Sequence, residues 1–351
     1  MLTLEEIKAQ VQPFDQAAAD AAAQHWYTCA KPLFALGKLE DAVIQMAGIK
    51  KTPDYRLNKK GLIIMCADNG VVAEGISQTG QEVTGLVAAS LLRGGTSVCR
   101  MAAVARAAVE PVDMGMAARV PGVSGPHIAD GTRNIAAGPA MTQAQALAAI
   151  EAGVELVKSH RAAGCDVLLT GEMGIGNTTT SSALSAALLG LPVEEVTGRG
   201  AGLSDAGLDR KIAAIRRALA VNRAALGDPL SALAALGGFD IAGMAGIFLG
   251  GALCRVPVMI DGYISAVAAL VAARLCPQAV CAMLPSHVSA EPAGLRVLRE
   301  LGLKPLICAE MRLGEGTGAV AALPLLDMAL AVYHSSASFA ALGMDGYTPQ
   351  C

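Results

Sequence analysis

The distribution of hydrophobic residues predicts a sheet of buried strands separated by helices. Six short runs are apolar at nearly every position, which is typical of parallel strands buried on both faces. The runs cover residues 61–67, 109–113, 166–170, 256–260, 280–284 and 305–309. Because helical patterns lie between them, we expect an α/β fold: an open parallel, Rossmann-like sheet with helices on both faces. The pattern does not give the strand order.

Helical periodicity also marks both ends of the chain. Three helices are expected over 4–12, 15–27 and 36–47, and a long apolar helix from about Ala319. Within the chain, Thr142 begins a capping box, Ser204 precedes another amphipathic pattern, and a helix is expected over 181–189. These patterns predict a smaller helical domain from residues 1–60 and 325–351, and a parallel α/β domain over 61–324. The segment 120–139 is rich in glycine and proline and is predicted to form an excursion or lid.

The composition narrows the class of partner. The chain is 53% hydrophobic and 16% charged, yet no stretch reaches about 18 uninterrupted apolar residues, so we expect no membrane span. The amino terminus shows no signal or transit pattern, which favours a cytoplasmic location. A net charge of -3 with few aromatic residues argues against nucleic-acid binding. Nine cysteines without CxxC pairs predict neither disulfides nor zinc. A small ligand is the expected partner, with no metal and no cofactor.

Glycine-rich loops follow several of the predicted strands. In the loop 171–180, glycines alternate with Glu172, Asn177 and Thr178 directly before a helix. Free backbone N–H groups and hydroxyls at a helix start suit a phosphate or carboxylate. The loop is neither a Walker loop nor a Gly-x-Gly-x-x-Gly fingerprint. A plain helix start with permissive glycines is therefore an equal alternative.

Single polar residues near other strand ends could bind a ligand or act in catalysis, but each could also have a purely structural role. Arg199 could pair with an anion or face solvent, and Lys211 is more often an exposed helix cation than a ligand. Asp261 could cap the helix that follows it. His287 is placed as a general base would be, but a lone histidine is more often structural.

Two glutamates, Glu172 and Glu315, lie among glycines. A glutamate in an apolar pocket has a raised pKa and can act as a general base. For Glu315 the alternative is that it complements the dipole of the following helix.

Taken together, these loops resemble a known family. They are similar, in order, to segments of the nicotinate-nucleotide:dimethylbenzimidazole phosphoribosyltransferases, the CobT family of cobalamin synthesis. The segments that carry the resemblance are 66–75, 81–84, 171–180, 198–200, 238–243, 261–263, 286–294 and 312–318. They span essentially the whole chain from Gly61 onward.

The resemblance implies a reaction. In that family nicotinate mononucleotide gives its 5-phosphoribosyl group to an aromatic lower-ligand base, nicotinate leaves, and an α-ribotide forms for cobamide assembly. The glutamate of the Arg-Leu-Gly-Glu-Gly-Thr-Gly loop is the general base, which here is Glu315. The nucleotide-binding positions that the resemblance implies are Glu172, Gly174, Gly176, Asn177, Thr178, Gly200, Lys211 and Ser289. No metal is implied, because the pyridinium ring is already a good leaving group.

The acceptor side departs from the family pattern. The family usually has the tripeptide Asp-His-Gly where this chain has Asp68-Asn69-Gly70. It commonly has Ser-Pro where this chain has Thr79-Gly80. The acceptor-pocket candidates are Thr79, Val83 and Leu313. Dimethylbenzimidazole, a related benzimidazole, a purine or a phenol such as p-cresol all stay open. The implied assembly is a homodimer, with a heterodimer of paralogous subunits as the alternative. A non-catalytic nucleotide-binding subunit is the rival interpretation, although the chain keeps Glu315.

Overall fold

A parallel five-stranded sheet forms the centre of the molecule. The structure is a computed structural model that describes residues 3–348. The strands are β1 (Lys60–Ala67), β2 (Ala107–Gly115), β3 (Val167–Met173), β4 (Val258–Ile260) and β5 (Met283–Pro285). Their order is β2-β1-β3-β4-β5, and every neighbouring pair is parallel. The predicted α/β class and parallel sheet are confirmed.

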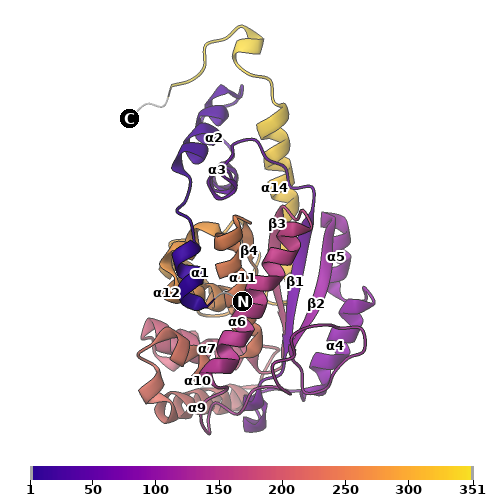
Figure 1. Cartoon of the computed structure of the whole chain (residues 1–351), viewed down its shortest axis with the longest axis vertical. Helices are drawn as coiled ribbons and strands as arrows, with labels where there is room; N and C mark the ends of the chain where they lie inside the picture. Colours follow the sequence, from indigo (N-terminus) through magenta and orange to yellow (C-terminus); the bar gives the residue numbers. More distant parts are fainter. Residues whose placement is uncertain (1–2, 349–351) are drawn as a thin grey trace.

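Helices cover both faces of this sheet, as expected. The helices are α1 (Leu4–Gln10), α2 (Gln16–Thr28), α3 (Lys38–Lys50), α4 (Glu82–Leu92), α5 (Ser97–Ala105), α6 (Gln143–Ala162), α7 (Asn177–Leu189), α8 (Val193–Val196), α9 (Asp205–Val221), α10 (Pro229–Leu236), α11 (Phe239–Cys254), α12 (Tyr263–Leu275), α13 (Gly294–Glu300) and α14 (Thr317–Ser335). In Figure 1, α6 and α11 lie on one side of β1 and β2, and α4 and α5 lie on the other.

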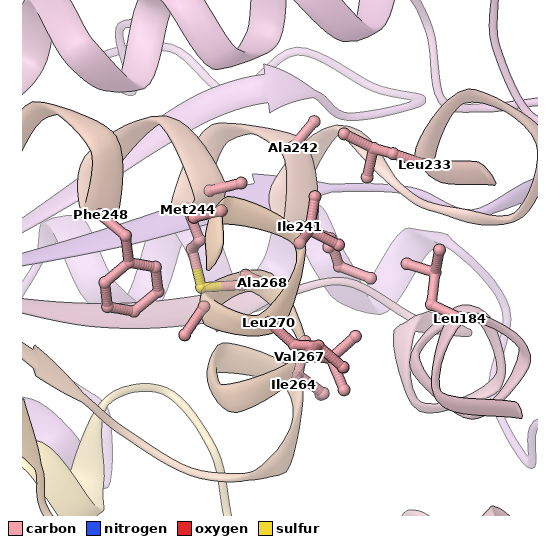
Figure 2. Packing of buried hydrophobic residues seen from close by; sticks show 14 of the residues in the cluster. Leu184, Leu233, Ile241, Ala242, Met244, Phe248, Ile264, Val267, Ala268 and Leu270 are labelled. Carbon is pink, nitrogen blue, oxygen red and sulfur yellow. The ribbon is translucent and has the colours of Figure 1, made fainter. Parts of the chain in front are cut away.

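The alternating side chains of β1 divide the core into two layers. Ile63 and Met65 join the hydrophobic cluster of α6, α11 and α12, whereas Leu62 and Ile64 join that of α3, α5 and α14. All eight residues of β1 are buried, which explains why its sequence is apolar from Gly61 to Ala67 rather than alternating. Figure 2 shows the first layer, where side chains of α11 and α12 interdigitate.

Helices α6 and α11 approach each other very closely. A Cβ atom on Gly153 would lie 2.1 Å from the carbonyl oxygen of Gly243, and one on Gly246 would lie 2.0 Å from that of Ile150. Only glycine therefore permits this contact between the two helices. Several of the chain's many glycines thus serve helix packing rather than ligand loops.

Two predicted strands differ from the structure. Residues 280–282 belong to a 3₁₀ helix, Pro277–Ala282, so β5 begins only at Met283. The run 305–309 forms no strand, and only Ile307 makes an isolated parallel bridge, to His287. Pro305 lacks an N–H donor and cannot contribute one to a ladder. The first four strands lie within two or three residues of their predicted limits.

The helix signals were more accurate. Thr142 forms the predicted capping box at the start of α6, and Ser204 caps α9. The helix expected over 181–189 begins four residues earlier, at Asn177. The excursion predicted over 120–139 contains no helix or strand.

The terminal helices α2, α3 and α14 pack at one end of the molecule (Figure 1). The division into two domains stays a prediction, and its boundary at residue 325 falls inside α14, directly after Pro324. This helix is long and apolar enough to cross a membrane by length and composition, but 56% of its most apolar 18-residue stretch is buried. It packs against α3, α5 and β3, as a core helix does.

Candidate active site

A cavity of about 220 Å³ opens beyond the carboxyl ends of the strands. The strand order reverses between β1 and β3, and in open α/β sheets ligands bind at such a switch point. The cavity begins at the end of β3, one of the two strands that flank this point. Its lining residues are Glu172, Met173, Gly174, Ile175, Asn177, Thr178, Gly200, Ala201, Asp261, Gly262, Tyr263, Ile264, Ser265, His287, Ser289, Glu291, Arg312, Leu313, Gly314 and Glu315. Eight of the twelve predicted site residues are therefore brought together.

Glu172, the last-but-one residue of β3, faces the cavity as part of a buried acidic pair. One oxygen of its carboxyl group accepts a hydrogen bond from the side-chain amide of Asn177, and this amide also donates to Asp240 over 3.0 Å. Burial raises the pKa of Glu172 well above its usual value and that of Asp240 to about 6. Because the two carboxyl groups share one neutral donor, the pair favours holding a proton.

Glu315 enters the cavity from a strained loop. It has a φ of 59°, between Gly314 at 83° and Gly316 at 89°. A positive φ is unfavourable for a residue with a side chain and is concentrated at functional sites. The backbone N–H of Glu315 lies 3.4 Å from the Glu172 carboxyl group, which ties this loop to β3.

The carboxyl group of Glu315 is available for chemistry. Its Oε2 atom is buried and has no hydrogen-bond partner among the described residues. Burial raises its pKa, against smaller opposing contributions from the backbone of Val98 and the side chain of Thr96. A carboxylate with raised basicity and a free oxygen is suited to accept a proton from a ligand.

The start of α14 is capped by Asp261 instead of Glu315. The Asp261 carboxylate accepts hydrogen bonds from the backbone N–H groups of Gly316 (3.1 Å), Gly318 (2.7 Å) and Ala319 (3.1 Å). The expectation that Asp261 caps the helix that follows it is therefore wrong: the N-cap residue of α12 is Gly262, and the helix has no side-chain cap. Because Asp261 fills the capping role, the helix-dipole interpretation of Glu315 loses its support.

A buried lysine stands behind the wall of the cavity at the first turn of α7. Lys211 is 1% exposed, which contradicts the expectation of an exposed helix cation. Its ammonium group donates to the hydroxyl of Thr178 (2.8 Å) and the carbonyl oxygen of Gly198 (3.0 Å). Burial lowers its pKa to about 8. A buried cation whose contacts here are neutral oxygens is a natural counter-charge for a phosphate at the start of α7.

Besides Lys211, three predicted site residues are absent from the cavity lining: Gly176, Thr79 and Val83. Gly176 is the residue before α7 and has a φ of 95°. Thr79 is exposed and Val83 is half-buried in the first turn of α4, whereas Leu313 lines the cavity and is 57% exposed. Arg199 pairs with Asp205 at the surface, as the solvent-facing alternative expected.

The sequence and the structure of this chain were compared with those of known proteins. A model described as "Phosphoribosyltransferase" (DBI_PRT) matches residues 11–343. The nicotinate-nucleotide–dimethylbenzimidazole phosphoribosyltransferase of Desulforudis audaxviator is 45% identical over 95% of this chain and 96% of its own. The enzyme of the same name from Halalkalibacterium halodurans is 41% identical over 99% of this chain and 98% of its own. The crystal structure of CobT from Thermus thermophilus superposes with a TM-score of 0.87 at 38% identity, covering 94% of this chain and 99% of that one.

The chain belongs to this phosphoribosyltransferase family. The resemblance drawn from eight loops is thus confirmed.

Several residues of this phosphoribosyltransferase site were not among the predicted ones. Asp240 is fully buried in α11, yet its sequence signal was visible, since it lies in one of the eight loops. Arg312 lines both the cavity and the adjoining hollow next to residues 197–202. Asp261 and His287 line the cavity too, but their roles depend on contacts with the start of α14, which is far away in sequence.

The described part of the chain contains no group of three or more His, Cys, Asp and Glu side chains arranged to hold a metal ion. Of the acidic residues that line the cavity, Glu172 accepts from the side-chain amide of Asn177, and Asp261 accepts from backbone N–H groups of α14.

Proposed function

We propose that this phosphoribosyltransferase moves the 5-phosphoribosyl group of nicotinate mononucleotide to an aromatic base, releasing nicotinate. The product is an α-ribotide for the nucleotide loop of a cobamide. The observation that carries the proposal is the pairing, in one cavity, of the free carboxyl oxygen of Glu315 with an anion-binding wall formed by α7 and Lys211. The relatives named for this reaction cover nearly the whole chain.

The nucleotide would lie along the loop that ends β3. Gly174, Asn177 and Thr178 line the cavity there, with Gly200 and Ser289 opposite. We assign the phosphate to the start of α7, where backbone N–H groups and Lys211 supply positive charge. Gly176 contributes by permitting the turn into the helix, since its φ is 95°.

Glu315 would act as the general base. The acceptor loses a proton as its attacking nitrogen or oxygen bonds to the ribosyl carbon, and the carboxylate takes that proton; a phenol loses it from the attacking oxygen, a benzimidazole from its other ring nitrogen. At the same time the bond from the ribosyl carbon to the pyridinium nitrogen breaks, and its electron pair neutralises the leaving nicotinate ring. The site contributes by orienting both rings and by excluding water from the ribosyl centre.

The acceptor would lie on the side of Glu315 and Leu313, with Thr79 and Val83 on the segment that leads into α4. We propose a benzimidazole, such as 5,6-dimethylbenzimidazole, because the relatives carry that name. A purine or a phenol stays the alternative acceptor, because this chain departs from the family pattern on the acceptor side at Asn69, Thr79 and Gly80. We further propose a cytoplasmic homodimer that needs no cofactor.

An acceptor panel tests the reaction. The protein is incubated with nicotinate mononucleotide and, in separate assays, dimethylbenzimidazole, adenine, phenol and p-cresol, and nicotinate release is followed by chromatography. We expect release with at least one acceptor and a ribotide of matching mass. No release with any acceptor, despite binding of the nucleotide, would instead support a non-catalytic subunit that requires a paralogous partner.

A further inference from the structure

Three segments of the chain meet at one buried hydroxyl group outside the cavity. Thr84 is 0% exposed and lies in the first turn of α4. Its Oγ1 atom is 2.6 Å from a carboxyl oxygen of Asp68, directly after β1, and 3.2 Å from the backbone nitrogen of Ile175. None of the predicted roles in phosphoribosyl transfer uses this hydroxyl.

The direction of both hydrogen bonds is determined by chemistry. The amide of Ile175 can only donate, so the Thr84 oxygen accepts there and its O–H donates to Asp68. The other carboxyl oxygen of Asp68 accepts from the backbone N–H of Ala117 (2.8 Å), and its carbonyl accepts from that of Thr132 (3.0 Å). Asp68 thus also holds the backbone just before the excursion 120–139, at Ala117, and within it, at Thr132.

Ile175 is the residue through which this network reaches the ligand. It lines the cavity between Gly174 and Gly176. On its other side, the Ile175 carbonyl lies 3.4 Å from the side-chain amide of Asn69. A Cβ atom on Gly174 would be 2.2 Å from the carbonyl oxygen of Ala67, so the loop rests directly on the end of β1. The N–H bond to Thr84 therefore sets the orientation of a peptide in the nucleotide loop.

We propose that Thr84 is a positioning residue that couples the acceptor side of the site to its nucleotide loop. The segment 79–83, which leads into α4, moves with Thr84, and Ile175 moves with the nucleotide. Through this hydroxyl, ordering of one side orders the other. The proposal rests on the proposed function, because it concerns the binding of nicotinate mononucleotide by the loop at Ile175.

Replacement of Thr84 by valine tests this role. Valine has nearly the same shape but can neither donate to Asp68 nor accept from Ile175. We expect Thr84→Val to lower kcat/KM for nicotinate mononucleotide about tenfold, mainly through KM, because the loop loses its alignment. Thr84→Ser keeps the hydroxyl and should restore kcat/KM to within about threefold of the wild type.

A matched control separates positioning from loss of any buried hydroxyl. Tyr55 is also buried and lies outside the cavity lining, and its hydroxyl donates to the carbonyl oxygen of Val43 in α3 (2.8 Å). Tyr55→Phe should leave kcat/KM within about threefold of the wild type, even where it lowers the melting temperature by a similar amount. If Thr84→Val did not fold, Thr84→Ala would remove the same two bonds.

The possible outcomes are distinct. The proposal is overturned if Thr84→Val matches Tyr55→Phe in kcat/KM, or if Thr84→Ser fails to restore it. If even the wild type releases no nicotinate, the proposed transfer is wrong, and the same variants are compared by calorimetric titration with nicotinate mononucleotide. There the proposal requires about tenfold weaker binding to Thr84→Val and recovery in Thr84→Ser.

Discussion

At the scale of single residues, the site depends on charged groups kept away from water. Glu315 has a buried carboxyl oxygen without a partner, and Lys211 has a buried ammonium group that contacts neutral oxygens. Both situations are unfavourable in the empty protein, because a desolvated charge lacks compensation. Their pKa values shift in the direction that weakens the charge, upward for Glu315 and downward for Lys211. A ligand that brings a proton to the first and a phosphate to the second compensates both.

Replacing Glu315 by glutamine should remove the base and leave the binding surface intact. We expect kcat to fall by about 100-fold or more, the usual contribution of a general base, with the dissociation constant of nicotinate mononucleotide nearly unchanged. The wild type should lose kcat/KM as the pH falls, at a higher pH than an exposed glutamate would cause, because burial raises the pKa of Glu315. The variant should lack this acid limb.

The matched control for this variant is Glu310→Gln. Glu310 also has a positive φ, of 52°, but its side chain is exposed and lies outside the cavity lining. The Glu310→Gln variant should therefore retain the wild-type turnover rate. A Glu315→Gln enzyme that turns over at the rate of this control would rule out the assigned role, whereas a loss of folding would favour a structural one.

The proposed role of Lys211 predicts that nucleotide affinity depends on pH. Burial lowers the pKa of Lys211 to about 8. Below that pH the ammonium group is charged and ready for the phosphate, and above it binding must take up a proton. The affinity for nicotinate mononucleotide should therefore weaken as the pH rises above 8, by up to about tenfold per unit. Calorimetric titrations from pH 7 to 9.5 measure this.

Lys211→Met and Lys158→Met provide the comparison. Methionine at 211 should weaken binding at pH 7 and abolish the dependence above pH 8. Lys158 pairs with Glu155 on the surface of α6, and its replacement should change neither quantity. If the pH dependence persisted in Lys211→Met, another group would be responsible.

At the scale of elements, the start of α14 decides where Glu315 lies. Three backbone N–H groups at the start of this helix donate hydrogen bonds to one carboxylate, that of Asp261, which follows β4. The cap comes from a different strand, so it fastens the loop 312–316 to the sheet as well as satisfying the helix. The Glu315 loop is thus held on one side by Asp261 and on the other by Glu172.

Asp261→Ala should destabilise the fold more than an ordinary cap mutation. It leaves three buried N–H groups without an acceptor, and we expect a loss of about 3 kcal/mol in the free energy of unfolding. Asp228 is the control, because it caps α10 through one backbone N–H at 2.8 Å and is exposed. Asp228→Ala should cost about 1 kcal/mol. Equal losses in urea unfolding of the two variants would show that the three-donor cap has no special weight.

At the scale of the whole molecule, topology gathers the chemistry. The ends of β3, β4 and β5 deliver Glu172, Asp261 and His287 to one cavity, although they are separated by 89 and 26 positions in the chain. Parallel strands make this possible, because all their carboxyl ends point to the same edge of the sheet. The excursion and α4, both attached near β1 and β2, reach the same loop through Asp68 and Thr84.

The sequence by itself determined the class of fold, and eight of the twelve site residues that it predicted line the cavity. Buried parallel strands are apolar at every position, so β1 to β4 could be located, and glycine loops with fixed polar neighbours identified the family and Glu315. It could not give the strand order, the partner of Asp261 or the burial of Lys211. It also left Asp240 and Thr84 unassigned. Each of these depends on contacts between residues distant in the chain, which local periodicity does not encode. Tertiary structure alone decided which neighbouring groups surround each charge, and therefore its pKa and its availability to a ligand.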